Sequence, residues 1–331
     1  MSKISIGLMI ASLLMIPTIA AGQSAPPAQK SLPLKLVDDF AALNGNAPHA
    51  RVNHAKGVVV EGTFTPSKAA ASVSKAAHFQ KQRNPISVTI RFSDGSGMPN
   101  ESDTNTINRG MAIKFTLPSG AKTDIVSLSY NGFPVATAEE FSQFLEAIAA
   151  SGPNAPKPTP LDTFLGMHPA AKTFVTAAKP PPVSFGTVAY YGINSFKFTN
   201  AKGAEIYGRY QIIPVAGTHV LTSAQLAKKG PNYLVDELGP QLRKGPVKFT
   251  LRLQVAEAGD KIDDPSVTWP ASRKMVTLGT ITITRPTMDS HTEDKWLFLP
   301  GAVTDGIEPA DPMIAVRSAA YPISFARRLT P

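Results

Sequence analysis

The chain has 331 residues, of which 43% are hydrophobic and 17% charged, and it contains no cysteine. These values exclude a disulfide-stabilised scaffold, a metal site with cysteine ligands and a chain too polar to fold. The formal net charge is +9, but the basic residues occur singly and without interleaved aromatic residues, so we expect no nucleic-acid partner.

The first 22 residues have the pattern of a secretory signal peptide. Lys3 precedes an apolar run from Ile6 to Ile16, and small residues follow at 20–22. The run is shorter than the roughly 18 apolar residues that a membrane helix needs, and no other segment reaches that length. We therefore expect cleavage near residues 20–22, export to a bacterial periplasm, and no membrane attachment afterwards.

The rest of the chain is predicted to form one domain. Residues 23–34 are rich in proline, alanine and serine and are expected to be a flexible leader. No internal repeat or change of composition divides residues 35–331.

Strand patterns dominate the first part of this domain. Alternating or β-branched residues cover 57–64, 86–92, 111–117 and 124–129. Between the first two, residues 67–83 are rich in alanine, lysine and serine and are predicted to be helical.

Helical patterns follow. Thr137 and Glu140 form a capping box that opens a helix over 138–150, with Phe141 and Phe144 on its apolar face. A proline-rich loop then separates this helix from a second helical piece over 161–178.

Four more strand candidates complete the domain, at 187–198, 204–213, 247–255 and 275–284. In 247–255, apolar and polar residues alternate, so one face of this strand is expected to be buried. Eight strands are enough to close a barrel. The predicted fold is therefore α+β, an eight-stranded antiparallel β-barrel with peripheral helices.

Common catalytic motifs are absent from the sequence. It contains no His-Glu-x-x-His, no Gly-x-Ser-x-Gly, no Walker loop and no Gly-x-Gly-x-x-Gly after a strand. Its six histidines show no metal-ligand spacing.

A more specific pattern is distributed over distant segments. They read RVNHAKG at 51–57, IRFS at 90–93, NRGMAIKF at 108–115, YGINSFKF at 191–198 and RSAAYP at 317–322. These segments resemble the haem catalase superfamily, in which R-x-x-H-A-K-G carries the distal histidine and R-x-x-x-Y-P the proximal tyrosine ligand. The chain is most similar to the small exported catalase-related peroxidases, which keep the haem barrel without wrapping and C-terminal domains. The resemblance implies a barrel of catalase type and haem b as cofactor.

The resemblance makes Tyr321 the axial iron ligand. Iron in a five-coordinate haem needs one anionic donor, and a phenolate supplies it. A free phenol ionises near pH 10, so a phenolate ligand needs a stabilising cation. Arg317 lies four residues before Tyr321, a spacing that places both side chains on one helical face.

On the opposite haem face, the resemblance implies catalytic roles for His54 and Asn131. An imidazole suits the task of taking a proton from peroxide and returning it to the departing oxygen. Ser93 would hydrogen-bond His54 and fix its tautomer. Asn131 would orient the peroxide oxygens, although its spacing to the next proline is one residue longer than usual. The alternative for Asn131 is a turn residue before Gly132.

Further residues are expected to hold the cofactor. Arg51, Arg91 and Arg328 match the family positions that bind the haem propionates, for which the arginine fork is suited. Phe141 or Phe144 would stack on the porphyrin, although both also fit a plain helix core.

Two departures from the family pattern bear on activity. Asn53 stands before His54 where catalases carry an aliphatic residue, and Asn194 stands where they often carry histidine. A polar Asn53 can hydrogen-bond the imidazole or the peroxide and so disturb the geometry that oxidation of a second peroxide needs. This favours peroxidase over catalase turnover. The sequence does not predict how Asn194 affects activity.

The sequence thus predicts a peroxidase that reduces hydrogen peroxide or organic hydroperoxides with small organic electron donors and has weak catalase activity. The alternatives are a true catalase, an isomerase of fatty-acid hydroperoxides, and a haem- or lipid-binding barrel without turnover. We expect a monomer or a small homo-oligomer.

Overall fold

The computed structural model describes residues 30–287 and 295–329, and the chain from Ser31 onward forms one compact unit. The predicted signal peptide and most of the predicted leader lie outside the described residues. Helix α1 (Leu32–Asn44) begins inside the leader segment and buries Leu36, Val37 and Ala41. The last residues of that segment are therefore helical.

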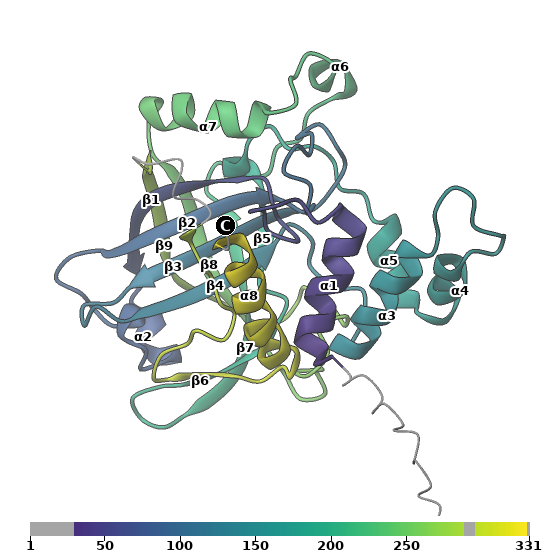
Figure 1. The fold of residues 1–331 in the computed structure, drawn as a ribbon. Helices are drawn as coiled ribbons and strands as arrows, with labels where there is room; N and C mark the ends of the chain where they lie inside the picture. The colour runs from purple at the N-terminus through teal and green to yellow at the C-terminus, as the bar shows by residue number, and fades with distance from the viewer. Residues whose placement is uncertain (1–29, 288–294, 330–331) are drawn as a thin grey trace, which may run out of the picture. The chain divides into compact units, whose positions relative to one another are not determined.

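Eight antiparallel strands close a barrel, as predicted. They are β1 (Gly57–Pro66), β2 (Ile86–Asp94), β3 (Arg109–Thr116), β4 (Lys122–Leu128), β5 (Tyr190–Tyr191), β7 (Glu205–Pro214), β8 (Val247–Val255) and β9 (Met275–Pro286). Their order around the barrel is β7-β5-β4-β3-β2-β1-β9-β8, and the pairing of β8 with β7 closes it (Figure 1). Two further strands, β6 (Phe196–Thr199) and β10 (Ile307–Pro309), extend the sheet beyond β7.

Aromatic and aliphatic side chains fill the barrel core. Phe64, Phe115 and Phe249 are fully buried there, and T-shaped contact joins the first two at a centroid distance of 5.3 Å. The alternation predicted for 247–255 is confirmed at Phe249, Leu251 and Leu253, which are all 0% exposed. Gln254 on the other face is also buried, and its amide is satisfied there because it donates to Pro270 O at 2.9 Å.

The strand predicted over 187–198 is interrupted. It begins with a 3-10 turn, η2 (Phe185–Thr187), continues as β5 and resumes only as β6. Between them, Gly192 N donates to Tyr210 O of β7 at 2.9 Å, whereas Ser195 O accepts from Ala310 N at 3.0 Å, so the stretch leaves β7 and binds the loop before the C-terminal helix.

The helix predicted over 67–83 is wrong as one element. The segment holds only α2 (Ala70–Val73) and the 3-10 turn η1 (Ala77–Phe79). Ser74 between them is fully buried and donates to Gly306 O at 2.7 Å, while Lys75 N donates to Thr199 O at 2.9 Å. These bonds to the β6–β10 edge replace the backbone bonds that a continuous helix would make.

The helix predicted over 138–150 is confirmed as α3 (Ala138–Ala149). Its capping box is present: Glu140 N donates to Thr137 Oγ1 at 3.2 Å, and Thr137 N donates to Glu140 Oε2 at 3.3 Å. The segment 161–178 splits into α4 (Pro160–Met167) and α5 (Pro169–Thr176), because Pro169 starts a new helix.

The remaining helices are α6 (Ser223–Leu226), α7 (Tyr233–Lys244) and α8 (Met313–Leu329). Helices α1, α3 and α8 pack together beside the barrel, and α7 packs against β9 (Figure 1). Among the described residues, no helix is long and apolar enough to cross a membrane.

Candidate active site

A cavity lies between strands β2–β4 and helices α1, α3 and α8. The loops 51–54 and 296–298 complete its wall. Its empty space, including the part open to solvent, is about 1310 Å³. Four arginines line it, and none of the described residues in its wall is acidic. The lining of the cavity therefore favours a mostly apolar, anionic ligand.

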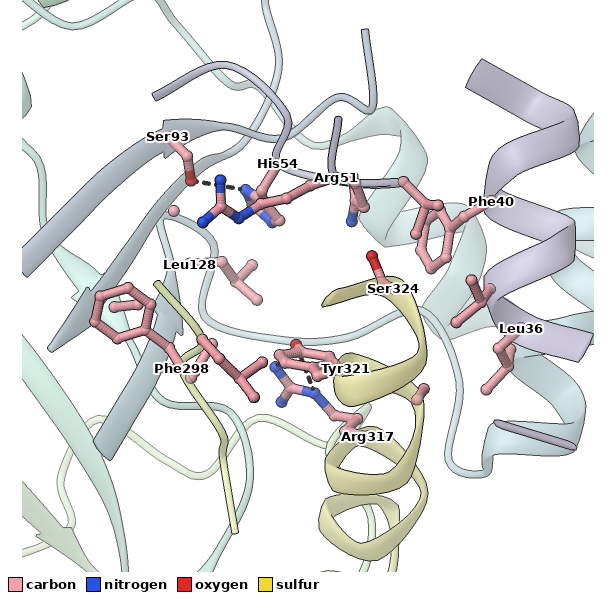
Figure 2. A pocket seen from close by; sticks show the side chains of 18 of the residues that line it. Leu36, Phe40, Arg51, His54, Ser93, Leu128, Phe298, Arg317, Tyr321 and Ser324 are labelled. Atoms are coloured by element: carbon pink, nitrogen blue, oxygen red, sulfur yellow. Dashed lines mark hydrogen bonds between the residues drawn. The ribbon is translucent and has the colours of Figure 1, made fainter. Parts of the chain in front are cut away.

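His54 lies on one side of the cavity, and Tyr321 lies on the opposite side (Figure 2). His54 Nδ1 is 3.0 Å from Ser93 Oγ, so the predicted pair is confirmed. Its backbone is held in the left-handed region, at φ 55°. Such strain in a non-glycine residue persists only where the surrounding structure fixes it.

The electrostatic surroundings keep His54 uncharged. Burial is the largest cause, and the positive charges of Arg91, Arg317 and Arg51 add to it, so that the pKa of His54 falls from 6.5 to about 4. A hydrogen bond to the Asp94 backbone acts in the opposite direction. At neutral pH, His54 is therefore an imidazole able to accept a proton.

Each residue of the HAKG segment after His54 has a structural reason. Ala55 O accepts from Arg91 Nη2 at 3.0 Å. Lys56 Nζ is 2.5 Å from Asp103 Oδ1 and donates to Glu101 O at 2.8 Å, which fastens the segment to the loop before β3. A Cβ on Gly57 would lie 2.3 Å from Phe92 O and 2.7 Å from Arg91 Cζ, so only glycine fits there.

Tyr321 and Arg317 lie on one face of α8, as their spacing predicts. Arg317 donates to the Tyr321 hydroxyl oxygen from Nε at 3.2 Å and from Nη2 at 2.7 Å. The Tyr321 oxygen thus accepts two hydrogen bonds from a permanent cation. Figure 2 shows the pair below the open space of the cavity.

Asn194 connects Arg317 to a buried carboxylate, a role that the sequence did not reveal. Arg317 Nη1 donates to Asn194 Oδ1, and Asn194 Nδ2 donates to Asp311 Oδ2 at 2.6 Å. Asp311 Oδ1 also accepts from Met313 N, at 2.9 Å, at the start of α8. An amide donates and accepts at once and carries no charge, so it bridges the two groups at any pH.

The three predicted propionate-binding arginines all reach the cavity. Arg51 Nη2 and Arg328 Nη2 both donate to Trp296 O, at 3.0 and 3.2 Å. Arg91 is 4% and Arg328 6% exposed. Cations this deeply placed in an apolar wall suit carboxylates of a bound ligand.

Of the two phenylalanines predicted to stack on a cofactor, only Phe141 lines the cavity. Its ring centroid lies 4.7 Å from that of Phe133, which is also in the wall, and 5.7 Å from that of Phe40. Phe144 instead packs against Phe164 in the core of the helical layer.

Asn131 is not among the described residues that line the cavity, and its distal role stays a prediction. Asn131 lies in a turn, where its backbone carbonyl accepts a hydrogen bond from Thr268 Oγ1 at 2.8 Å. The asparagine that does line the cavity is Asn53, directly before His54.

Comparisons with known proteins agree with this geometry. The chain is 37% identical over 301 residues to the catalase-related peroxidase of Mycolicibacterium paratuberculosis. The aligned residues make up 89% of this chain and 94% of the relative. It is 31% identical over 284 residues to the catalase-related peroxidase of Synechococcus elongatus, and the aligned residues make up 84% of this chain and 83% of that relative.

Solved structures share the fold. A fungal catalase superposes with a TM-score of 0.76 at 22% identity, over 96% of this chain and 66% of its own. Catalase A of Saccharomyces cerevisiae gives 0.75 at 21% identity, over 94% and 67%. The chain thus spans about two thirds of the length of these catalases. The catalase family matches over residues 22–331, and the chain belongs to that family.

Proposed function

We propose that the protein is a haem-dependent peroxidase that reduces hydrogen peroxide or an organic hydroperoxide with small organic electron donors. The observation that carries this proposal is the pairing of an uncharged base with an arginine-bound tyrosine across one cavity. His54 is the base, and Tyr321 with Arg317 forms the other side. The catalase-related peroxidases among the relatives support the same activity.

The described residues fit haem b. The cavity is apolar along α1 and α3, as an uncharged macrocycle requires, and its wall contains arginines without acids, as two propionates require. Tyr321 would bind the iron, and Arg51, Arg91 and Arg328 the propionates. Bound haem would supply the redox-active iron at which the peroxide O–O bond is cleaved.

The chain's own residues would then handle the proton. His54, uncharged at neutral pH, would accept the proton of the peroxide and return it to the departing oxygen. Ser93 would hold the ring in position through Nδ1. Arg317 would hold the Tyr321 oxygen from the opposite side of the cavity, and Asn194 would fix the guanidinium.

Haemin titration tests this function. The wild-type protein is expected to bind one haem with a strong Soret band and to oxidise a phenolic donor with peroxide. Tyr321→Phe removes the ligand oxygen and is expected to shift or abolish the band. Tyr207→Phe, on a half-buried strand position outside the cavity, is the matched control and should keep it. A protein without a Soret band, or an unchanged band in Tyr321→Phe, contradicts the proposal.

The same proposal includes export to the periplasm as a monomer or small homo-oligomer. Lys3 and the apolar run from Ile6 to Ile16 support export. The mass of the protein recovered from a periplasmic fraction is expected to correspond to a start near residues 20–22. A full-length chain found only in the cytoplasmic fraction contradicts this part of the proposal.

A further inference from the structure

A second hollow adjoins the cavity and belongs to no function derived above. Its lining residues are Lys114, Lys122, Lys295, Trp296 and Leu297, and its space, including the part open to solvent, is about 820 Å³. Trp296 and Leu297 also line the main cavity. A wall of these residues therefore separates the hollow from the site described above.

The charges of this hollow are arranged for an anion. Lys114 is buried and bound to both oxygens of Asp124 at 2.6 Å, so this pair is neutralised internally. Lys122 and Lys295 are exposed and provide the charge of the hollow. Lys295 follows two acidic residues in the sequence, Glu293 and Asp294, which lie outside the described residues. Lys122 is therefore the main cation of the hollow.

The aromatic surface of the hollow adds a second requirement. Lys122 Nζ lies 5.8 Å from the centroid of the Trp296 ring, so one ligand can contact both the cation and the indole. The Trp296 and Phe298 rings are stacked at 6.3 Å, and Figure 2 shows Phe298 in the wall of the main cavity. Trp296 O accepts from Arg51 and Arg328, which fixes the wall in place.

We propose that this hollow binds the electron donor, and that the donor is an aromatic carboxylate such as a phenolic acid. The proposal rests on the proposed peroxidase function. Two donors would each lose one electron and one proton, and hydrogen peroxide would take up both electrons and both protons to give two waters. The carboxylate would lie on Lys122 and Lys295, and the ring on Trp296, one wall away from the reaction site.

Charge reversal in the haem-loaded protein tests the site. Lys122→Glu is made alone and together with Lys295→Glu, and Lys172→Glu with Lys228→Glu is the matched control, since it makes the same change in net charge at exposed positions elsewhere. Equilibrium dialysis measures the Kd of 4-hydroxybenzoate, and peroxide-dependent oxidation of 4-hydroxybenzoate and of uncharged phenol gives KM values. We expect the double variant to raise the Kd and KM for 4-hydroxybenzoate about tenfold, as expected from the loss of two exposed ion pairs, with less effect on phenol and in the control.

Three outcomes overturn the inference. The first is a Kd for 4-hydroxybenzoate in the double variant that equals that of the control pair. The second is binding of cyclohexanecarboxylate as tight as that of 4-hydroxybenzoate, which would make the hollow a general anion site. The third is an equal rise in KM for phenol, which would indicate damage to the main cavity. Failure of the proposed function is distinguishable, because a protein without peroxidase activity toward phenol still reports its affinity for 4-hydroxybenzoate in dialysis.

Discussion

At the scale of single residues, the surroundings of His54 decide whether it can act as a base. An imidazole in water is half protonated near pH 6.5, and a protonated ring cannot take a proton from peroxide. Burial and three nearby arginines lower the pKa of His54 to about 4. The residue is therefore in its active form over a wider pH range than a free histidine.

This shift predicts an unusual acid limit of activity. The kcat/KM for peroxide should stay level from pH 8 to about 5 and then fall roughly tenfold per pH unit below about 4, as the protonated form accumulates. Stopped-flow pH jumps measure the rate, and the absorption spectrum at each pH separates protonation from loss of haem. A midpoint near 6.5 with haem retained would show that the surroundings do not act on His54 as inferred.

The two asparagines give a second prediction at this scale. Asn53 lines the cavity beside His54 and Asn131 does not, so the amide near the peroxide is expected to be that of Asn53. Asn53→Val should raise oxygen evolution relative to donor oxidation by about fivefold, the effect of losing one hydrogen bond of roughly 1 kcal/mol. Asn131→Ala is the control and should leave the ratio within twofold. The converse result would return the distal role to Asn131.

At the scale of elements, local patterns were predicted and distant contacts were not. The capping box of α3 and the pairing of Arg317 with Tyr321 depend on residues three or four apart, and both are present. The bond between Arg317 and Asn194 joins residues 123 apart, and the bond between Ser74 and Gly306 joins residues 232 apart. No periodicity encodes such pairs, so the role of Asn194 and the break in 67–83 required the fold.

Ser74 gives a test of that break. Its hydroxyl donates to Gly306 O at 2.7 Å and accepts from Ala76 N at 3.0 Å, and the side chain is 0% exposed. Ser74→Ala removes the bond to Ala76 N and one of the two bonds to Gly306 O, which also accepts from Thr199 N at 3.0 Å, and should lower the free energy of unfolding by about 1–3 kcal/mol. Ser72→Ala, two residues earlier and exposed, is the matched control with an expected change below about 0.5 kcal/mol. Urea denaturation measures both, and equal losses would mean that Ser74 does not fix the segment.

At the scale of the whole molecule, composition set the class of the chain but not the location of its charge. The net charge of +9 is compatible with many partners. The fold gathers Arg51, Arg91, Arg317 and Arg328 from two elements and a loop around one cavity. The absence of acidic residues from the described wall of that cavity is a property of the fold and not of the composition.

The barrel also couples the stability of the whole molecule to pH through His78. This ring lies 4.0 Å from Phe79 and 5.0 Å from Phe115, measured between centroids, and is 1% exposed. Burial lowers the pKa of His78 from 6.5 to about 3. Between these two values the unfolded chain binds a proton that the folded protein does not, so this residue destabilises the fold as the pH falls from about 6.5 toward about 3.

His78→Leu should remove that contribution while keeping the core apolar. The free energy of unfolding of the variant, relative to wild type, should therefore rise by roughly 1.4 kcal/mol for each pH unit between 6 and 4. Guanidinium denaturation at pH 7, 6, 5 and 4 measures this difference. His219→Leu, which removes an exposed histidine, is the control and should give a curve parallel to that of wild type. If the curve of His78→Leu is also parallel to that of wild type, His78 is protonated to the same extent in the folded and unfolded chains, and the barrel does not exclude its charge.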